Sequence, residues 1–237
     1  MNLSIVIPAY NEEGRMAKAV EALNAFLPGL EAEPEIVFVD DGSTDRTAEM
    51  LSAGPARFAF DLLSYRPNRG KGYALKQGIL KASGEYVLFL DVDMSTPLAE
   101  LAKFREAMRR RVPVIIGSRR AAGSRVLKSQ SLLRQKLGEG FSFLSKVLLV
   151  PGITDFTCGF KVFRRDAAQR IFKAQRIERW GYDTEVLFLA RRFGYAIEEI
   201  PVSWENDERT KVRLLKDVAR SLGDLVRIRL NALLGKY

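Results

Sequence analysis

The sequence predicts an α/β fold, a single domain built on a mostly parallel central sheet with helices on both faces. Short apolar segments of strand length alternate with segments of helical periodicity through the first half of the chain. Three of the strand-like segments end in polar or glycine-rich turns. Such alternation implies parallel strands joined by right-handed crossovers, and sheets of this kind bind ligands at the carboxyl ends of their strands.

The first half of the chain supplies five of the expected strands. They are short runs rich in branched or aromatic residues, at 3–7, 35–39, 58–64, 86–90 and 112–117. Helices are expected between them, over about 15–27, 46–51 and 72–82. The turns at 8–14, 40–45 and 91–93 follow three of these strands, so a parallel sheet would bring all three turns to one edge.

The pattern changes after residue 118. A basic loop leads to an apolar-rich helix over about 132–150, and a strand-like unit begins at Thr154. A helix over about 183–193, with Asp183 as its N-cap, and a strand over about 196–202 follow. We expect residues 1–208 to form one domain, with halves 1–118 and 119–208, and residues 209–237 to form a helical tail.

Composition excludes several function classes. The 237 residues contain no histidine, so Ser-His-Asp chemistry and His-ligated zinc are excluded, and any metal must be held mainly by oxygen ligands, as Mg²⁺ or Mn²⁺ is. The net charge of +9 suggests an anionic partner. Cys158 is the only cysteine, which excludes an internal disulfide and favours a reducing compartment. We expect neither a signal peptide nor a membrane-spanning helix.

The most informative segment ends in two aspartates. The apolar run at 87–90 stops at Asp91-Val92-Asp93. Alternate residues of an extended segment project to the same side, so the two carboxylates can converge on one hard cation. Taken alone, two aspartates with this spacing also occur simply as a solvated turn. Two further ligand-type turns at the same sheet edge favour a metal site.

Several segments together resemble the family 2 glycosyltransferases of the GT-A fold. In the first half they are SIVIPAYNEE at 4–13, VDDGSTD at 39–45, NRGKG at 68–72 and DVD at 91–93. In the second half they are GSR at 117–119, DFTCGFK at 155–161, WGYDTE at 180–185 and SLGDLVRIR at 221–229. The later segments are similar to the polyprenyl-phosphate (dolichyl-phosphate) glucosyltransferases, close to the mannose synthases. The resemblance covers nearly the whole chain and implies that 1–118 binds a nucleotide sugar and 119–208 the acceptor.

The resemblance also implies roles for residues of the first half. Asp91 and Asp93 would hold Mg²⁺ or Mn²⁺ against the departing diphosphate, where negative charge develops. Asp41 would accept a hydrogen bond from a ring N–H of the base. The positions implied in nucleotide-sugar binding are Pro8, Tyr10, Glu12, Val39, Asp41, Lys71, Asp91, Val92, Asp93 and Ser95.

Basic residues of the second half match positions near the phosphates. Arg119 matches a family arginine near the nucleotide sugar, and Arg134 is expected to meet the acceptor phosphate. Arg209 and Lys211 match a late basic pair that returns over the diphosphate. The planar guanidinium grips phosphate oxygens in pairs, which suits these roles. Asp155 either orients the acceptor or the sugar, or is only a turn residue.

The implied reaction is transfer of a hexose, with glucose from UDP-glucose favoured, to a polyprenyl or dolichyl phosphate. Ser95 stands where mannose synthases usually carry glutamine, which favours glucosyl transfer over GDP-mannose chemistry. A phosphate monoester is largely dianionic at neutral pH and is already a nucleophile. Positioning and charge neutralisation are then sufficient, which explains why no histidine is needed. Direct in-line attack would invert the anomeric centre.

The tail combines a basic charge with an apolar stripe. Residues 209–237 hold eight Lys or Arg and two Asp, a net charge of +6. Such a basic amphipathic helix favours peripheral binding to the cytoplasmic face of a membrane, although packing on the domain is the alternative. The residues at helical spacing along one face are Val212, Leu215, Ala219, Leu222, Val226, Leu230 and Leu233.

Three other functions are alternatives to glycosyl transfer onto a lipid phosphate. A soluble glycosyltransferase with a hydroxyl acceptor would need a general base and would have no use for a basic tail. A nucleic-acid-binding module would need a basic stripe with stacking aromatic residues, and the sequence has none. A nucleotidyltransferase would lack the segments at 155–161 and 183–185. The sequence leaves open the base, the polyprenol and the oligomeric state.

Overall fold

The structure, a computed structural model, describes residues 2–53, 56–207, 209 and 214–237. Its centre is a seven-stranded sheet in the order β3-β2-β1-β4-β7-β5-β8, and β6 pairs with β9 in a separate ribbon. The strands are β1 (Leu3–Ala9), β2 (Glu35–Asp40), β3 (Asp61–Ser64), β4 (Tyr86–Leu90), β5 (Val114–Ser118), β6 (Arg125–Lys128), β7 (Phe160–Arg164), β8 (Ile197–Pro201) and β9 (Ser203–Glu205).

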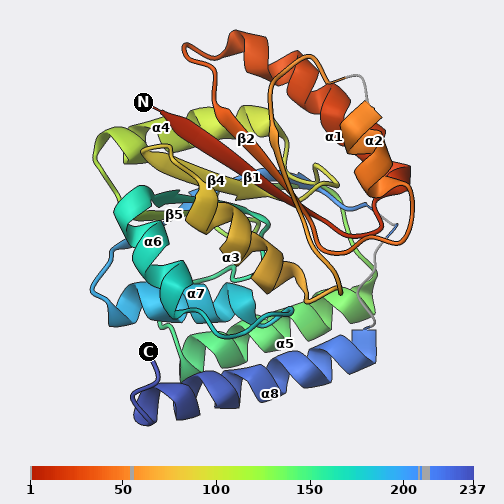
Figure 1. Cartoon of the computed structure of the whole chain (residues 1–237). Helices are drawn as coiled ribbons and strands as arrows, with labels where there is room; N and C mark the ends of the chain where they lie inside the picture. The colour runs from red at the N-terminus through yellow and green to blue at the C-terminus, as the bar shows by residue number, and fades with distance from the viewer. Residues whose placement is uncertain (1, 54–55, 208, 210–213) are drawn as a thin grey trace.

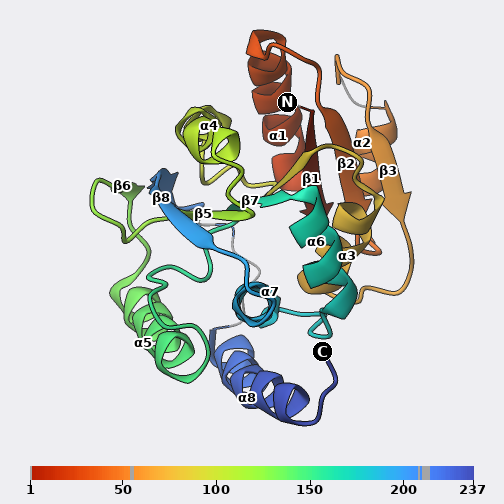
Figure 2. The same cartoon turned by 90° about the vertical axis from the view of Figure 1, so that its left-hand side faces the viewer.

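Helices cover both faces of this sheet, as Figures 1 and 2 show. The α-helices are α1 (Glu13–Phe26), α2 (Thr47–Ala53), α3 (Lys71–Lys81), α4 (Leu101–Arg109), α5 (Leu132–Leu148), α6 (Arg165–Ala174), α7 (Tyr182–Arg192) and α8 (Leu214–Leu233). Strand residues alternate between two cores. In β1, Val6 faces the core shared with α3, α6 and α7, whereas Ile5 and Ile7 face the core shared with α1 and α4. The predicted α/β domain with a mostly parallel sheet is confirmed.

β7 is the antiparallel member of the sheet. It pairs antiparallel with β4 on one side and with β5 on the other, whereas the other pairs in the sheet are parallel. The chain leaves β5 at the carboxyl edge and re-enters the sheet from that same edge, so β7 begins where β4 ends, with Phe160 opposite Leu90. The strand expected after Thr154 is therefore present, and its direction brings Gly159 to the aspartate turn.

Some local features differ from the sequence-based expectation. The basic loop after residue 118 contains the short strand β6, and α6 follows β7 directly without having been expected. The N-cap of α7 is Gly181, so the prediction of Asp183 as the N-cap was wrong. Asp183 lies instead in the first turn of α7, where its carboxylate accepts a hydrogen bond from Lys161.

The tail forms one helix, α8, that packs beside α5 and below α7 (Figure 2). Its inner face contributes Leu225 and Ile228 to the core, at 1% and 0% exposure. Of the stripe identified in the sequence, Val226, Leu230 and Leu233 are exposed on the other side, whereas Leu222 is partly buried against the core. Val212 lies outside the described residues. Among the described residues, no helix has the length and hydropathy needed to cross a bilayer.

Candidate active site

The three ligand-type turns meet at one edge of the sheet, as predicted. Ala9 pairs with Asp40 across parallel strands, and β4 runs parallel to β1, so the turns after β1, β2 and β4 lie at the same carboxyl edge. Two of these turns are bonded to each other. The Asn11 amide donates to Ser43 Oγ at 2.9 Å, and the Thr44 amide donates to Asn11 Oδ1 at 2.7 Å. The edge is therefore a connected surface.

Asp41 organises the glycine-rich turn before α3. Its buried carboxylate accepts hydrogen bonds from Asn68 Nδ2 at 2.6 Å and from the amides of Arg69 and Gly70 at 2.8 Å each. Gly70 has a φ of +118°, and a Cβ there would meet the Glu178 carbonyl oxygen at 2.6 Å, so only glycine fits. Asp41 thus fixes the entry of α3 and the position of Lys71. Its predicted contact with the base stays a prediction.

Asp91 is held by Lys71 and Gly159. Lys71 Nζ lies 2.5 Å from Asp91 Oδ1. The other oxygen rests on Gly159, where a Cβ would approach it to 2.1 Å. Burial alone would lower the pKa of Lys71, but the charges of Asp91 and Asp183 outweigh it and raise that pKa. The ammonium group is therefore a fixed positive charge beside the aspartate turn.

Asp93 lies in a more weakly paired position. The Ser95 amide donates to Asp93 Oδ1 at 2.9 Å, and Arg15 NH1 lies 3.9 Å from Asp93 Oδ2. Burial raises the pKa of Asp93, and the charge of Asp91 raises it further. An additional cation next to Asp93 would relieve both effects. Asp93 is consequently the carboxylate better placed to receive a metal ion.

Arg119 and Asp155 form a closed pair after β5. Arg119 Nε and NH2 donate to the two oxygens of Asp155 at 2.7 and 2.8 Å, and the Arg119 amide donates at 3.0 Å. Burial would raise the pKa of Asp155, but Arg119 outweighs it and holds that pKa well below its usual range. The Asp155 side chain has 0% exposure and is covered by Arg119, and its predicted catalytic role stays a prediction.

The late basic residue Arg209 returns to the first turn. Its NH1 donates to the Gly14 carbonyl oxygen at 2.6 Å, and its NH2 lies 2.8 Å from Asp207 Oδ2. Arg209 is thus brought to the start of α1, next to the turn after β1. Lys211 lies outside the described residues. Arg134 is half-buried in the first turn of α5, and its predicted contact with the acceptor phosphate stays a prediction.

The other implied nucleotide-binding residues differ in exposure. Val39 is fully buried against α3, and Pro8 and Val92 are also buried, so these three can meet a ligand only through their main chains. Tyr10 is 36% exposed, and Glu12 is 9% exposed. The side chain of Tyr10 is therefore open to a ligand at this edge, whereas that of Glu12 is largely covered.

Two functional contacts were missed from the sequence. Arg15, in the first turns of α1, lies within 3.9 Å of carboxylate oxygens of Glu12, Asp93 and Asp207. The guanidinium of Arg119 also lies over the Trp204 ring, 5.2 Å from its centroid. The contacts of Arg15 with Asp93 and Asp207, and that of Arg119 with Trp204, join segments far apart in the chain. The i, i+3 spacing of Glu12 and Arg15 was the one available signal.

A fully buried ion pair lies behind the aspartate turn. Lys161 Nζ donates to Asp183 Oδ1 at 2.6 Å and to the Cys158 carbonyl oxygen at 2.7 Å. Lys161 is 0% exposed and cannot reach a ligand. The pair joins β7 to α7 directly beneath the loop that carries Gly159. The sequence offered no signal for it beyond the two charged residue types.

The donor set at the aspartate turn fits a hard divalent cation. A small cleft of about 10 Å³, about room for one water, is lined by Asp91, Asp93, Ser95, Thr96, Gly159 and Trp204. Among the described residues no three His, Cys, Asp or Glu side chains cluster around a possible metal position. Mg²⁺ and Mn²⁺ take few carboxylates and complete their coordination with substrate oxygens and water.

The arrangement of the chain is similar to that of solved nucleotide-sugar enzymes. Glucosyl-3-phosphoglycerate synthase from Mycobacterium tuberculosis, in a complex with Mn²⁺, UDP and phosphoglyceric acid, gives a TM-score of 0.70 at 20% identity over 97% of this chain and 78% of the other. TarS from S. aureus, in complex with UDP-GlcNAc, gives 0.64 at 17% identity over 98% and 67%. These similarities define the fold, a single α/β domain with a mostly parallel central sheet.

Similarity in sequence is higher and extends over nearly the whole chain. The Glycosyl transferase family 2 model matches residues 4–172, and this chain belongs to that family. Dolichyl-phosphate beta-glucosyltransferases are 35% identical in Dictyostelium discoideum over 98% of this chain and 75% of the relative, and 36% identical in Saccharomyces cerevisiae over 99% and 76%. The human enzyme of the same name is 34% identical over 99% and 77%.

Proposed function

We propose that this chain transfers a glucosyl group from UDP-glucose to the phosphate of a polyprenyl or dolichyl lipid, with inversion at the anomeric carbon and with a divalent cation. The observation that carries the proposal is the pairing, at one sheet edge, of the aspartate turn with the Arg119–Asp155 pair. Near-full-length similarity to dolichyl-phosphate beta-glucosyltransferases supports the donor sugar and the acceptor class.

On the donor side, the residues neutralise and hold a diphosphate. A divalent cation beside Asp93, when bound, supplies positive charge to the leaving group. Lys71 and Arg15 lie on either side of the aspartate turn and add two further positive charges of the protein itself. Arg209, anchored on Gly14 and Asp207, is placed to cover the diphosphate from the opposite loop.

On the acceptor side, the residues position a phosphate that is already a nucleophile. The Asp155 carboxylate and the Trp204 ring hold the Arg119 guanidinium in one orientation. Because Arg119 is preorganised, little conformational entropy is lost when it grips a phosphate oxygen. No side chain needs to remove a proton, since the phosphate monoester is largely dianionic at neutral pH.

We also propose that the protein meets its lipid substrate by lying on the cytoplasmic face of a membrane. α5 and α8 lie side by side along one surface (Figures 1 and 2). Their outer sides expose apolar residues that we call the apolar face: Phe143, Leu144, Val147, Leu148, Val226, Leu230, Leu233 and Leu234. Exposed apolar patches of this kind favour a membrane or protein contact. One free, buried cysteine and no disulfide suit the reducing cytoplasmic side.

The test is transfer of radiolabel from UDP-glucose into a solvent-extractable lipid, with polyprenyl phosphate in detergent. We expect label in the lipid fraction that depends on added Mg²⁺ or Mn²⁺. Asp93→Asn should lower the rate by about 100-fold or more, whereas Asp61→Asn, a control at an exposed carboxylate of β3, should not. No labelled lipid with any polyprenyl phosphate, or faster labelling from GDP-mannose, would contradict the proposal.

A further inference from the structure

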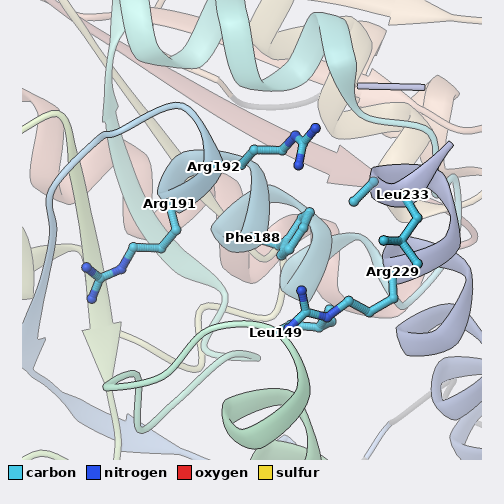
Figure 3. A pocket seen from close by; sticks show the side chains of 7 residues that line it. Leu149, Phe188, Arg191, Arg192, Arg229 and Leu233 are labelled. Carbon is cyan, nitrogen blue, oxygen red and sulfur yellow. The ribbon is translucent and has the colours of Figure 1, made fainter. Parts of the chain in front are cut away.

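A second cavity lies far from the aspartate turn. It has a volume of about 340 Å³ and is lined by Leu149, Phe188, Arg191, Arg192, Arg229, Ala232 and Leu233 (Figure 3). The lining comes from the C-terminal parts of α7 and α8 and from the residue after α5. The start of α7 lies near the aspartate turn, since Lys71 Nζ is 5.8 Å from the Tyr182 ring centroid, and a rise of 1.5 Å per residue puts Arg191 about 13 Å further along that helix. The volume falls within the range of small-ligand sites.

The cavity is positively charged. Arginines 191, 192 and 229 contribute three positive charges, and among the described residues no carboxylate lines the cavity. The C-terminal ends of α5, α7 and α8 meet there, and each adds a partial charge of about −0.5. Neutralising the three ends uses about 1.5 positive charges, so about 1.5 remain for an anion. The arginines therefore exceed what helix capping requires.

Two of the arginines are arranged around an apolar floor. Phe188 and Leu149 are 6% and 5% exposed and form the floor. Arg229 Nε donates to the Leu148 carbonyl oxygen at 2.6 Å, which holds its guanidinium 5.8 Å from the centroid of the Phe188 ring. In Figure 3, Arg192 lies on the other side of Phe188, whereas Arg191 points away from both. Arg192 and Arg229 thus flank the Phe188 ring, and both side chains line the cavity.

The cavity adjoins the apolar face. Leu233 is 82% exposed and belongs to both, and Leu148, whose carbonyl Arg229 binds, is also part of the apolar face. α7 lies one helix layer above α5 and α8 (Figure 2). Amphipathic helices insert their apolar side about 5–10 Å into a membrane, and packed helices are about 8–10 Å apart. If α5 and α8 lie in the interface, the end of α7 is at the depth of the phosphates.

We propose that this cavity binds the phosphate headgroup of an anionic phospholipid of the bilayer, as an accessory site separate from the acceptor site. The phosphate lies between Arg192 and Arg229, and the adjoining acyl chain lies against Phe188 and Leu233. The proposal rests on the membrane contact proposed above. A phosphate site of this kind would make the membrane contact prefer negatively charged lipids and would fix the orientation of the protein on the surface.

The test measures binding of the full chain to phosphatidylcholine vesicles with and without phosphatidic acid, at constant ionic strength. We expect phosphatidic acid to tighten binding. Arg192→Gln should lower the affinity for vesicles with phosphatidic acid by about tenfold, as loss of a charge-assisted hydrogen bond would. Arg191→Gln is the matched control, because it removes the same charge from the same helix turn. It should cost at most about fivefold, the general effect of one charge near an anionic surface.

Each other outcome has a defined meaning. Equal losses in the two variants would show general attraction and overturn the site. Stabilisation of the protein by inorganic phosphate that disappears in Arg192→Gln, without any preference among vesicles, would assign the cavity to a free anion and overturn the lipid. Absence of binding both to neutral vesicles and to vesicles with phosphatidic acid would instead refute the membrane contact itself.

Discussion

Lys71 Nζ lies 2.5 Å from Asp91 Oδ1, and the same carboxylate rests on Gly159, so one aspartate of the turn is fixed from two directions. The two supports come from the start of α3 and from the loop before β7. Because β7 runs antiparallel, its first residues lie beside the end of β4. The geometry of the aspartate turn thus depends on the direction of one strand.

The first prediction concerns Gly159→Ala. The added Cβ would approach Asp91 Oδ2 to 2.1 Å, so the carboxylate must move away from Lys71. We expect glucosyl transfer to fall by at least about tenfold, because small misplacements in a catalytic site are costly. The rate and the melting temperature should be measured together. Gly140→Ala, where nothing lies within 4 Å of the new Cβ, is the control and should keep the wild-type rate. A wild-type rate in Gly159→Ala would show that Asp91 needs no fixed position.

The second prediction concerns the pair of Arg119 and Asp155. Arg119→Met leaves a carboxylate of 0% exposure without its partner, which should cost about 3–5 kcal/mol in the free energy of unfolding. In the wild type, Asp155 has a pKa below its unfolded value, so its stabilisation is present above about pH 5 and is lost as pH falls through the folded pKa.

The pH dependence of stability has opposite signs in the wild type and in Arg119→Met. In Arg119→Met, the charge and side-chain hydrogen bonds of Arg119 are lost, so burial outweighs the remaining amide hydrogen bonds and the charge of Arg120 and raises the pKa of Asp155; protonation then relieves the variant as pH falls. Urea unfolding at neutral pH and near pH 4 should therefore show a stability gap that narrows on acidification. Adding Asp155→Asn to the variant should remove that narrowing. A gap that stays constant with pH would contradict a charged pair.

The third prediction concerns the buried pair of Lys161 and Asp183. Lys161→Met should destabilise the protein by about 3–5 kcal/mol, because Asp183 would remain as an unpaired buried charge. The double variant with Asp183→Asn should recover most of that loss. If the double variant is as stable as the wild type but still inactive, the pair also positions the loop at Gly159. Full recovery of both properties would make the pair purely structural.

Local signals in the sequence were sufficient for the sheet edge and insufficient for its long-range pairs. Strands and turns are encoded by residues close together, so the convergence of the turns after β1, β2 and β4 could be predicted. The direction of β7 depends on where the chain re-enters the sheet, which no local pattern specifies. Lys161–Asp183 and Arg15–Asp93 join segments 22 and 78 residues apart, and only the folded chain brings them together.

The tail shows a related limit. Its helical periodicity was visible, but the apolar stripe does not identify what covers it, and the side that packs on the domain is the one carrying Leu225 and Ile228. Asp217, Ser221, Asp224 and Asn231 are also covered on that side. These covered polar residues interrupt the apolar periodicity of the packed side of α8. The apolar periodicity of the exposed side is therefore the clearer signal in the sequence.

The fourth prediction tests that outer stripe. Leu230→Gln and Leu233→Gln alter side chains that are 51% and 82% exposed, so the free energy of unfolding should change by no more than about 0.5 kcal/mol. If these residues enter a membrane, each substitution loses about 1.5–3 kcal/mol of apolar burial. We therefore expect binding of the double variant to neutral vesicles to fall by at least about 100-fold, measured by co-sedimentation. Ala102→Gln, on the exposed side of α4, is the control and should bind as the wild type does.

Transfer to a short, water-soluble polyprenyl phosphate should survive in the double variant of Leu230 and Leu233, because neither residue lines the aspartate turn. Loss of that transfer, or unchanged vesicle binding, would refute a role of this stripe in membrane contact.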